Sequence, residues 1–274
     1  MTFVKLPMHQ LPPKKKFGQN FLTDQSILER IILNAGKLEN KNILEIGGGS
    51  GNLTRHLLKA KPKKLTVIEI DKDYNEILSK ILESKTVETK LLSKDILKTE
   101  INRCFSEPPI IFGNLPYNIS TKILAKLLTE ENGKNQWDKL LLMFQLEVAN
   151  RIVAKPNTKQ YGRLSLFSQF YSSPSLEFQI SKHAFFPVPK VESALVKFQK
   201  TSENQTNYNS VLFQDIIRQS FQGRRKMLKN TLKNSYGDIS DVMKLCEIPE
   251  NSRPENISLK QFCGLTQAIE LSRK

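Results

Sequence analysis

Residues 110–120 read Ile-Ile-Phe-Gly-Asn-Leu-Pro-Tyr-Asn-Ile-Ser. An apolar, β-rich run ends abruptly, and a polar Asn114, a turn-forming Pro116 and an aromatic Tyr117 follow at once. This pattern predicts a strand that delivers its polar residues to the carboxyl edge of a sheet, where α/β proteins bind ligands. Because Pro116 fixes its own φ and favours an extended Leu115, we expect the loop to be stiff.

The side chains of this loop suit the recognition of an amino group on a base. The Asn114 side chain and the Leu115 carbonyl can both accept hydrogen bonds from one amino group. Tyr117 offers a flat face on which a base can stack. The alternative is an ordinary strand-to-helix turn in which Tyr117 fills a gap, and the wider pattern of the chain favours a binding site.

Three earlier strand-like segments also end in residues that can contact a ligand. Gly47 opens a glycine-rich turn whose backbone can approach a ligand closely. Glu69 lies at the tip of the next segment, 22 residues after Gly47, where it can accept hydrogen bonds from a ribose diol. Asp95 follows the third and can accept from an adenine amino group. The expected strands are residues 42–46, 65–71, 89–93 and 110–112.

The glycine-rich turn reads Gly47-Gly48-Gly49-Ser50-Gly51. The dinucleotide fingerprint requires its third glycine one residue later, where this chain has Asn52, so a nicotinamide cofactor is disfavoured. An acidic residue at the next strand tip suits any adenosine cofactor, including S-adenosylmethionine. Gly, Asp and Asn also favour turns in general, but a single binding cleft explains all four strand tips together.

The next part of the chain predicts further strands and a second aromatic residue for the site. We expect a stiff, extended loop around Pro187, with Phe185 just before it stacking on a base opposite Tyr117. The alternative is that Phe185 and Phe186 belong to the core. The expected strands are residues 139–145, an antiparallel pair at 164–171 and 176–180, and residues 194–198.

Polar, aperiodic residues at 201–210 predict a domain boundary. We expect a first domain at residues 1–200, with 1–13 mobile, and a helical second domain at 201–274. In the second domain, basic residues recur beside apolar ones at helical spacing, which suits docking on a polyanion or a solvated helix face. The stripe consists of Arg218, Arg225, Lys229 and Lys233, with Arg224 and Lys226 near it.

The composition narrows the class of partner. The 274 residues carry a formal charge of +15, and a basic protein usually meets a polyanion, with nucleic acid as the leading candidate. AT-rich genomes also raise the lysine content. No apolar run predicts a membrane span and no apolar segment follows Lys14-Lys15-Lys16, so we expect a cytoplasmic protein. Three spaced cysteines and three scattered histidines predict neither disulfides nor a metal site.

Taken together, these motifs resemble the ribosomal RNA adenine dimethyltransferases, and most closely the kasugamycin-sensitivity type that acts on the small subunit. The motifs are Lys15-Lys-Phe-Gly-Gln-Asn-Phe-Leu22, Glu45-Ile-Gly47, Val67-Ile-Glu-Ile-Asp71, Phe112-Gly-Asn-Leu-Pro-Tyr-Asn-Ile-Ser120, Tyr161-Gly-Arg-Leu-Ser165 and Phe185-x-Pro187-x-Pro189-Lys190-Val191. Residues 221–228 and 253–255 resemble the family's C-terminal domain. The family usually has proline where this chain has Gly48, so we expect a looser loop and weaker cofactor binding.

The resemblance implies an α/β, Rossmann-like class I methyltransferase domain with a seven-stranded, mostly parallel sheet, and a small C-terminal helical domain. It implies S-adenosylmethionine as methyl donor. The implied cofactor contacts are Asn20, Leu22, Gly47, Glu69, Asp95 and Asn114. The expected catalytic set is Asn114, Leu115, Tyr117 and Phe185. The expected RNA contacts are Lys14, Lys15, Lys16, Arg224, Arg225 and Lys229.

The implied reaction is dimethylation at N6 of two adjacent adenosines in a hairpin near the 3′ end of small-subunit rRNA. The implied partner is a pre-assembled small ribosomal subunit, and nothing in the sequence suggests more than a monomer. Three alternatives stay open. They are a large-subunit rRNA methyltransferase of the macrolide-resistance type, a non-catalytic rRNA-binding assembly factor and a DNA adenine methyltransferase.

Overall fold

The structure is a computed structural model, and it describes residues 12, 14, 18–129, 137–201, 208–223 and 226–273. It divides into two compact units, residues 1–149 with 175–199 and residues 150–174 with 200–274. The boundary expected after residue 200 lies one residue from the second division. Residues 150–174, which the sequence placed in the first domain, are grouped with the C-terminal segment. The expected mobility of residues 1–13 falls, apart from Pro12, outside the described residues.

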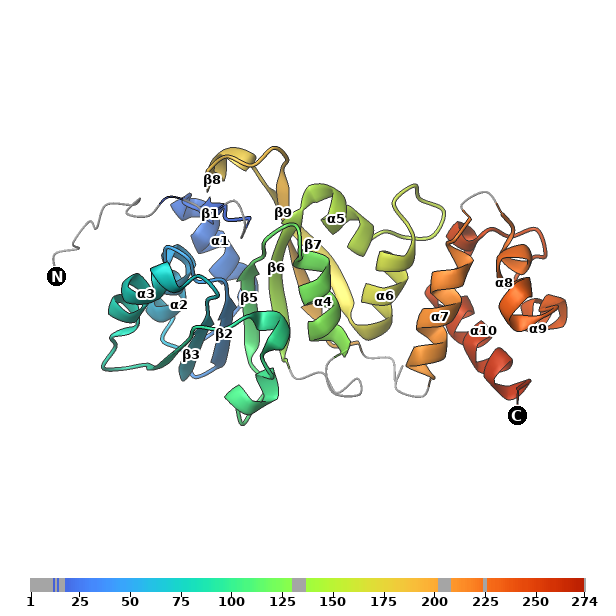
Figure 1. Ribbon diagram of the computed structural model, residues 1–274, viewed down its shortest axis with the longest axis horizontal. Coiled ribbons are helices and arrows are strands. Elements are labelled where there is room, and N and C mark those ends of the chain that lie inside the picture. The colour runs from blue at the N-terminus through green and yellow to red at the C-terminus, as the bar shows by residue number, and fades with distance from the viewer. Residues whose placement is uncertain are drawn as a thin grey trace. The chain divides into compact units, whose positions relative to one another are not determined.

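A seven-stranded sheet with flanking helices forms the first unit (Figure 1), in the order β4-β3-β2-β5-β6-β9-β7. The five strands from β4 to β6 are parallel and β9 is antiparallel to β6, which confirms the predicted fold class. The strands are β2 (Asn42–Ile46), β3 (Lys64–Ile68), β4 (Glu88–Leu92), β5 (Ile110–Asn114), β6 (Lys139–Gln145), β7 (Ser173–Ile180) and β9 (Ser193–Gln199). Strand β2 is buried along its whole length and β5 is buried up to Gly113, so neither strand alternates between apolar and exposed polar residues.

Apolar helix faces cover this sheet. The first helix begins after Asp24, whose carboxylate accepts hydrogen bonds from the N–H groups of Ser26 and Ile27, and it buries Leu28 and Ile31. The α-helices are α1 (Gln25–Ala35), α2 (Asn52–Lys59), α3 (Asn75–Leu82), α4 (Ser120–Thr129) and α5 (Leu146–Ile152). Short 3₁₀ turns are η2 (Lys72–Tyr74), η3 (Ile96–Lys98), η4 (Ile101–Cys104) and η5 (Lys182–Ala184).

A separate two-stranded ladder fixes the N-terminal segment to the first unit. Strand β1 (Phe21–Leu22) pairs antiparallel with β8 (Phe185–Phe186), with Leu22 opposite Phe185. Both of these side chains are buried in the core. The Ala184 carbonyl also accepts a hydrogen bond from the Thr23 N–H at 2.8 Å. The ladder therefore holds residues 21–23 in place beside the sheet edge that carries the predicted strand tips.

The predicted strand at residues 164–171 is wrong, because these residues form helix α6 (Arg163–Tyr171). Its buried Leu166 and Phe170 lie four residues apart, which is a helical spacing. The Phe170 ring stacks on Phe213 with the ring centroids 4.0 Å apart. Packing within the second unit thus overrides the β-like composition of this segment. The expected hairpin with residues 176–180 does not form, and β7 lies beside β9 instead.

The rest of the second unit is helical, as predicted. Helix α10 begins after its cap Ser258, whose hydroxyl accepts from the Gln261 N–H. The Tyr161 hydroxyl donates to the Ile257 carbonyl at 2.8 Å, which ties the unit's two chain segments together. The helices are α7 (Ser210–Ser220), α8 (Leu228–Tyr236), α9 (Ser240–Leu245) and α10 (Leu259–Leu271). Within the described ranges, we find no helix of the length and apolarity that a bilayer crossing requires.

Candidate active site

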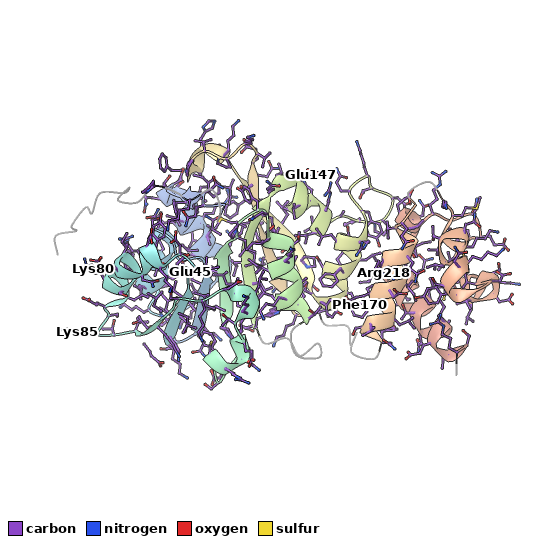
Figure 2. All side chains as sticks on the ribbon, in the orientation of Figure 1. Glu45, Lys80, Lys85, Glu147, Phe170 and Arg218 are labelled. Carbon is purple, nitrogen blue, oxygen red and sulfur yellow. The ribbon has the colours of Figure 1, made fainter. Side chains whose placement is uncertain are left out.

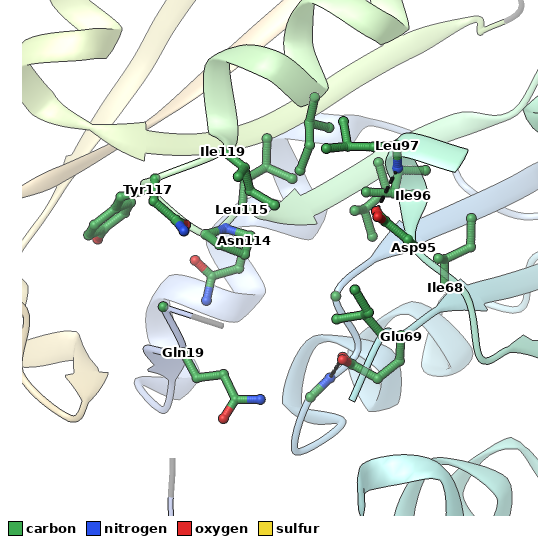
Figure 3. Close-up of a pocket in the computed structure, with 18 of the residues that line it drawn as sticks. Gln19, Ile68, Glu69, Asp95, Ile96, Leu97, Asn114, Leu115, Tyr117 and Ile119 are labelled. Carbon is green, nitrogen blue, oxygen red and sulfur yellow. Dashed lines mark hydrogen bonds between the residues drawn. The ribbon is translucent and has the colours of Figure 1, made fainter. Parts of the chain in front are cut away.

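A pocket of about 290 Å³ opens at the carboxyl edge of the sheet (Figure 3). Its wall contains all four of the residues that the sequence placed at the strand tips, which are Gly47, Glu69, Asp95 and Asn114. Asn20 joins them from the N-terminal segment. The four predicted residues therefore lie around one pocket, and their role as cofactor contacts stays a prediction. Leu22, the sixth expected cofactor contact, is not part of the wall and lies buried in the core.

The Glu69 carboxylate is held by two backbone groups. The Gly49 N–H donates to its Oε2 and the Asp71 N–H donates to its Oε1, both at 2.8 Å. Burial raises the pKa of this carboxyl, while the two backbone hydrogen bonds oppose the rise. A carboxylate oxygen can accept more than one hydrogen bond, so Glu69 keeps acceptor capacity toward the pocket. This arrangement fits the ribose diol of S-adenosylmethionine.

The glycine-rich turn places main-chain atoms of Gly47 and Gly49, which carry no side chain, in the pocket wall. Gly49 has a φ of +47°, and a Cβ added to it would lie 2.7 Å from Cε1 of Phe21. No side chain fits there without displacing that ring, so only glycine allows the turn and Phe21 to pack together. A wall of this kind admits a cofactor close to the main chain and fits S-adenosylmethionine.

At Gly48, where the family has proline, neighbouring side chains already fill the space that a proline ring would occupy. A Cβ on Gly48 would lie 2.6 Å from Cγ1 of Val67 and 3.0 Å from Cδ2 of Leu78. Val67 and Leu78 therefore pack closely against the turn at Gly48, and the expected looseness is not seen at this residue. Weaker cofactor binding stays a prediction.

Introducing the family's proline at Gly48 is expected to destabilise this protein. The ring would overpack a stiff, β-branched neighbour, which costs about 1–3 kcal/mol. Urea unfolding of Gly48→Pro measures this loss. The double variant Gly48→Pro, Val67→Ala should recover part of it, because the smaller side chain makes room. An unchanged free energy of unfolding in Gly48→Pro would show that Val67 does not restrict this position.

Two asparagine side chains fix the backbone of the N-terminal segment. Asn114 Nδ2 donates to the Asn20 carbonyl at 2.7 Å, and Asn52 Nδ2 donates to the Leu22 carbonyl at 2.8 Å. Asn52 occupies the position of the missing third glycine, so the structure shows what an asparagine does there. With its Nδ2 engaged, Asn114 presents only its Oδ1 as a free acceptor. Figure 3 shows Asn114, Leu115 and Tyr117 following one another along the wall.

The two predicted aromatic residues differ in their surroundings. Tyr117 lines the pocket, and its hydroxyl lies 2.6 Å from the Ser193 Oγ, which holds the ring by its far end. Burial raises the pKa of the Tyr117 phenol. Phe185 is only 2% exposed, lies in the core and does not line the pocket. Side chains alternate along β8, so its neighbour Phe186 is the exposed one, at 43%. The structure therefore gives Phe185 the core position that was the alternative.

The sequence reasoning missed a second buried carboxyl beside the glycine-rich turn. Glu45 is 1% exposed on β2 (Figure 2), and the Thr54 hydroxyl donates to its Oε2 at 2.6 Å. Burial raises the pKa of the Glu45 carboxyl to about 8, against the opposing hydrogen bond from Thr54 and with a further rise from Glu69. An acidic residue within an otherwise apolar strand, directly before the glycines, was the signal available in the sequence.

The raised pKa of Glu45 predicts a pH-dependent stability. The folded protein keeps a proton on Glu45 up to about pH 8, whereas the unfolded chain releases it near pH 4.5. This contribution is fully present below pH 4.5 and is lost as the pH rises to about 8. We expect Glu45→Gln to remove a slope of up to about 1.4 kcal/mol per pH unit. Urea unfolding of both proteins across this range measures it, and parallel pH profiles would contradict the protonation of Glu45.

The expected RNA contacts are only partly within the described residues. The Lys14 ammonium lies 2.7 Å from Asp71 and 2.5 Å from Asp73. Lys229 lies 3.0 Å from Glu250. Both lysines thus have acidic partners in this structure. The other four, Lys15, Lys16, Arg224 and Arg225, lie outside the described residues. Among the residues that are described, no group of three or more acidic, histidine or cysteine side chains could hold a metal ion.

Comparison with known proteins agrees with this geometry. The model of the family described as "Ribosomal RNA adenine dimethylase" matches residues 11–271. A protein of Pelagibacter ubique named "Ribosomal RNA small subunit methyltransferase A" is 39% identical over 258 residues, covering 94% of this chain and 97% of that protein. A protein of the same name from a Wolbachia of Drosophila simulans is 37% identical over 260 residues, covering 95% of this chain and 94% of that protein.

Solved structures agree as well. The crystal structure of a dimethyladenosine transferase from Plasmodium falciparum has a TM-score of 0.76 and 25% identity, covering 92% of this chain and 97% of that one. The 23S rRNA methyltransferase ErmE has a TM-score of 0.69 and 22% identity, covering 91% and 99%, and supports the fold alone. With a pocket that fits S-adenosylmethionine and a family match over nearly its whole length, the chain belongs to the ribosomal RNA adenine dimethylase family and is an S-adenosylmethionine-dependent rRNA methyltransferase.

Proposed function

We propose that this protein dimethylates N6 of two adjacent adenosines in a hairpin near the 3′ end of small-subunit rRNA. It acts as a monomer on a pre-assembled small ribosomal subunit in the cytoplasm, as a step of subunit biogenesis. The relatives at 37% and 39% identity, both named small-subunit methyltransferases, support this choice of subunit. The observation that carries the chemistry is the Asn114 amide, whose Nδ2 is bound to Asn20 and whose Oδ1 is left for a substrate amino group.

The residues that line the pocket would hold the cofactor. Glu69 would accept hydrogen bonds from the ribose hydroxyls, Asp95 would accept from the adenine amino group, and the turn at Gly47 and Gly49 would let the cofactor come close to the main chain. When bound, S-adenosylmethionine supplies a methyl group that its sulfonium already activates. The protein therefore needs to position the acceptor nitrogen more than to activate it.

The acceptor needs positioning because the N6 lone pair of adenine is delocalised into the ring. In a duplex or stacked loop the base is also out of reach, so it has to be flipped out. Tyr117 provides a face for the flipped ring, with its orientation fixed through Ser193. The Asn114 Oδ1 and the Leu115 carbonyl accept from the N6 amino group. These two hydrogen bonds draw the nitrogen toward tetrahedral geometry and direct its lone pair into the pocket.

A competition assay tests the choice of substrate. Labelled S-adenosylmethionine is incubated with the protein and undermethylated small subunits, large subunits and DNA, together and separately. We expect label in the small subunits alone. Label in large subunits would favour the macrolide-resistance type, and label in DNA would favour a DNA methyltransferase. Salt-sensitive binding to small subunits without any label would mean that the fold serves binding only.

A further inference from the structure

Asp71 follows the pocket-lining residues Glu69 and Ile70 in the sequence, does not itself line the pocket and is 2% exposed. Its Oδ1 accepts a hydrogen bond from Lys14 Nζ at 2.7 Å, and its Oδ2 accepts from Gln19 Nε2 at 3.0 Å. The Gln19 Oε1 in turn accepts from the Lys14 N–H at 2.7 Å. The carboxylate therefore holds the side chain that directly precedes Asn20.

Asn20 is the residue that orients the Asn114 amide. A backbone carbonyl oxygen can only accept hydrogen bonds, so the 2.7 Å contact with the Asn20 carbonyl requires the Nδ2 end of Asn114. The Oδ1 end must then be available to the substrate. If the Asn20 carbonyl moves, the amide loses the contact that fixes which of its two ends faces the target nitrogen.

We propose that Asp71 is a positioning residue for methyl transfer: by holding Gln19 it fixes the Asn20 carbonyl, which orients the Asn114 Oδ1 toward the adenosine N6. The inference rests on the proposed function, since it assigns the role of Asn114 in that reaction. Asp71 acts indirectly, through Gln19, the Asn20 carbonyl and the Asn114 amide. The same residue also reaches Glu69, because its N–H donates to Glu69 Oε1 at 2.8 Å.

The chemistry of Asp71 suits such a role. Although burial by itself raises the pKa of its carboxyl, the hydrogen bonds from Lys14 and Gln19 lower it below its ordinary value. The group is therefore ionised at neutral pH, and its hydrogen bonds are charge-assisted and stronger than neutral ones. A buried ionised group of this kind holds its donors in a narrow geometry.

Asp73 provides a matched control. It also contacts the Lys14 ammonium, at 2.5 Å, but its side chain is 51% exposed. No hydrogen bond joins it to Gln19 among the contacts of the described residues. Asp73→Asn therefore removes one negative charge near Lys14 and leaves the contact between Asp71 and Gln19 in place.

The test compares single-turnover rates of methyl transfer at saturating S-adenosylmethionine. We expect Asp71→Asn and Gln19→Ala each to lower the rate by about 10- to 100-fold, as a displaced catalytic group does. Asp73→Asn should stay within about twofold of the unmodified protein, as expected of an exposed charge. Rates near normal in both Asp71→Asn and Gln19→Ala would overturn the proposal. Gln19→Ala keeps the test informative if Asp71→Asn does not fold.

A double-mutant cycle distinguishes positioning from general damage. In an Asn114→Ala background, Asp71→Asn should lower the residual rate by no more than about twofold, because its effect passes through the missing amide. Full additivity of the two losses would overturn the proposed route through Asn114.

Amide hydrogen exchange of the cofactor-free protein gives a readout that is independent of activity. Residues 18–22 should exchange faster in Asp71→Asn than in Asp73→Asn. Unchanged exchange in Asp71→Asn would contradict the hold on Gln19. If the unmodified protein methylates no rRNA, the proposed function fails, while exchange still reports whether Asp71 holds the segment.

Discussion

Replacing Asn114 with alanine is expected to lower the single-turnover rate of methyl transfer by about 100-fold or more. The Asn114 Oδ1 accepts from an amino group that becomes more positive as the methyl group is transferred, so its hydrogen bond strengthens in the transition state. Removing one oriented group of this type costs about 3–4 kcal/mol of transition-state stabilisation. The measurement is label transfer from saturating S-adenosylmethionine to excess undermethylated small subunits.

The control for this variant is Asn118→Ala, which removes an amide from the same loop four residues later. Asn118 lines the pocket and is exposed, and it is not one of the two acceptors assigned to N6. We expect its rate to stay within about threefold of normal, as for a surface amide. Cofactor affinity measured by calorimetry should change little in Asn118→Ala, and cofactor binding should be at least partly retained in Asn114→Ala. A near-normal single-turnover rate in Asn114→Ala would falsify the role of this amide.

The second large effect is expected at Glu69, where the change should weaken cofactor binding. Glu69→Gln keeps the shape of the side chain but replaces one acceptor oxygen with an NH₂ group. That group would face the N–H of Gly49 or Asp71, both of which now donate to the carboxylate at 2.8 Å. The variant also loses the negative charge that strengthens the hydrogen bonds from the ribose hydroxyls. A hydrogen bond to a charged group contributes about 1.5–3 kcal/mol, so we expect the Kd for S-adenosylmethionine to rise about 10- to 100-fold.

Calorimetry of the cofactor with each variant measures this effect. Glu76→Gln is the matched control, because Glu76 is an exposed partner of Lys80 on α3, away from the pocket wall. Its Kd should be unchanged within about twofold. An unchanged Kd in Glu69→Gln would mean that the ribose hydroxyls do not depend on this carboxylate.

The sequence alone predicts the parts of the fold that local rules determine. The strand at Lys139–Gln145 is found where the pattern placed it, and the helix caps Asp24 and Ser258 are residues of the types that prefer this position. A continuous apolar run bounded by polar residues indicates a buried strand, and a cap shows itself by residue type and spacing. The convergence of Glu69 and Asn114 on one edge likewise follows from parallel βα units.

The sequence does not predict features that depend on contacts between distant segments. The helix at residues 163–171 forms because Phe170 stacks on Phe213, 43 residues away in the sequence. The burial of Phe185, rather than Phe186, follows from its pairing with Leu22 across β1 and β8. The contact between Asp71 and Gln19 spans 52 residues. No local pattern reports such pairings, since each is decided by the tertiary fold.

The most direct test of this mechanism is nucleoside mass spectrometry of rRNA from undermethylated small subunits after incubation with the protein and S-adenosylmethionine. We predict N6,N6-dimethyladenosine at two adjacent positions near the 3′ end of the small-subunit rRNA, and almost none with Asn114→Ala. Methyl groups on another base, or at another position of adenine, would contradict a pocket in which Asn114 and Leu115 present N6.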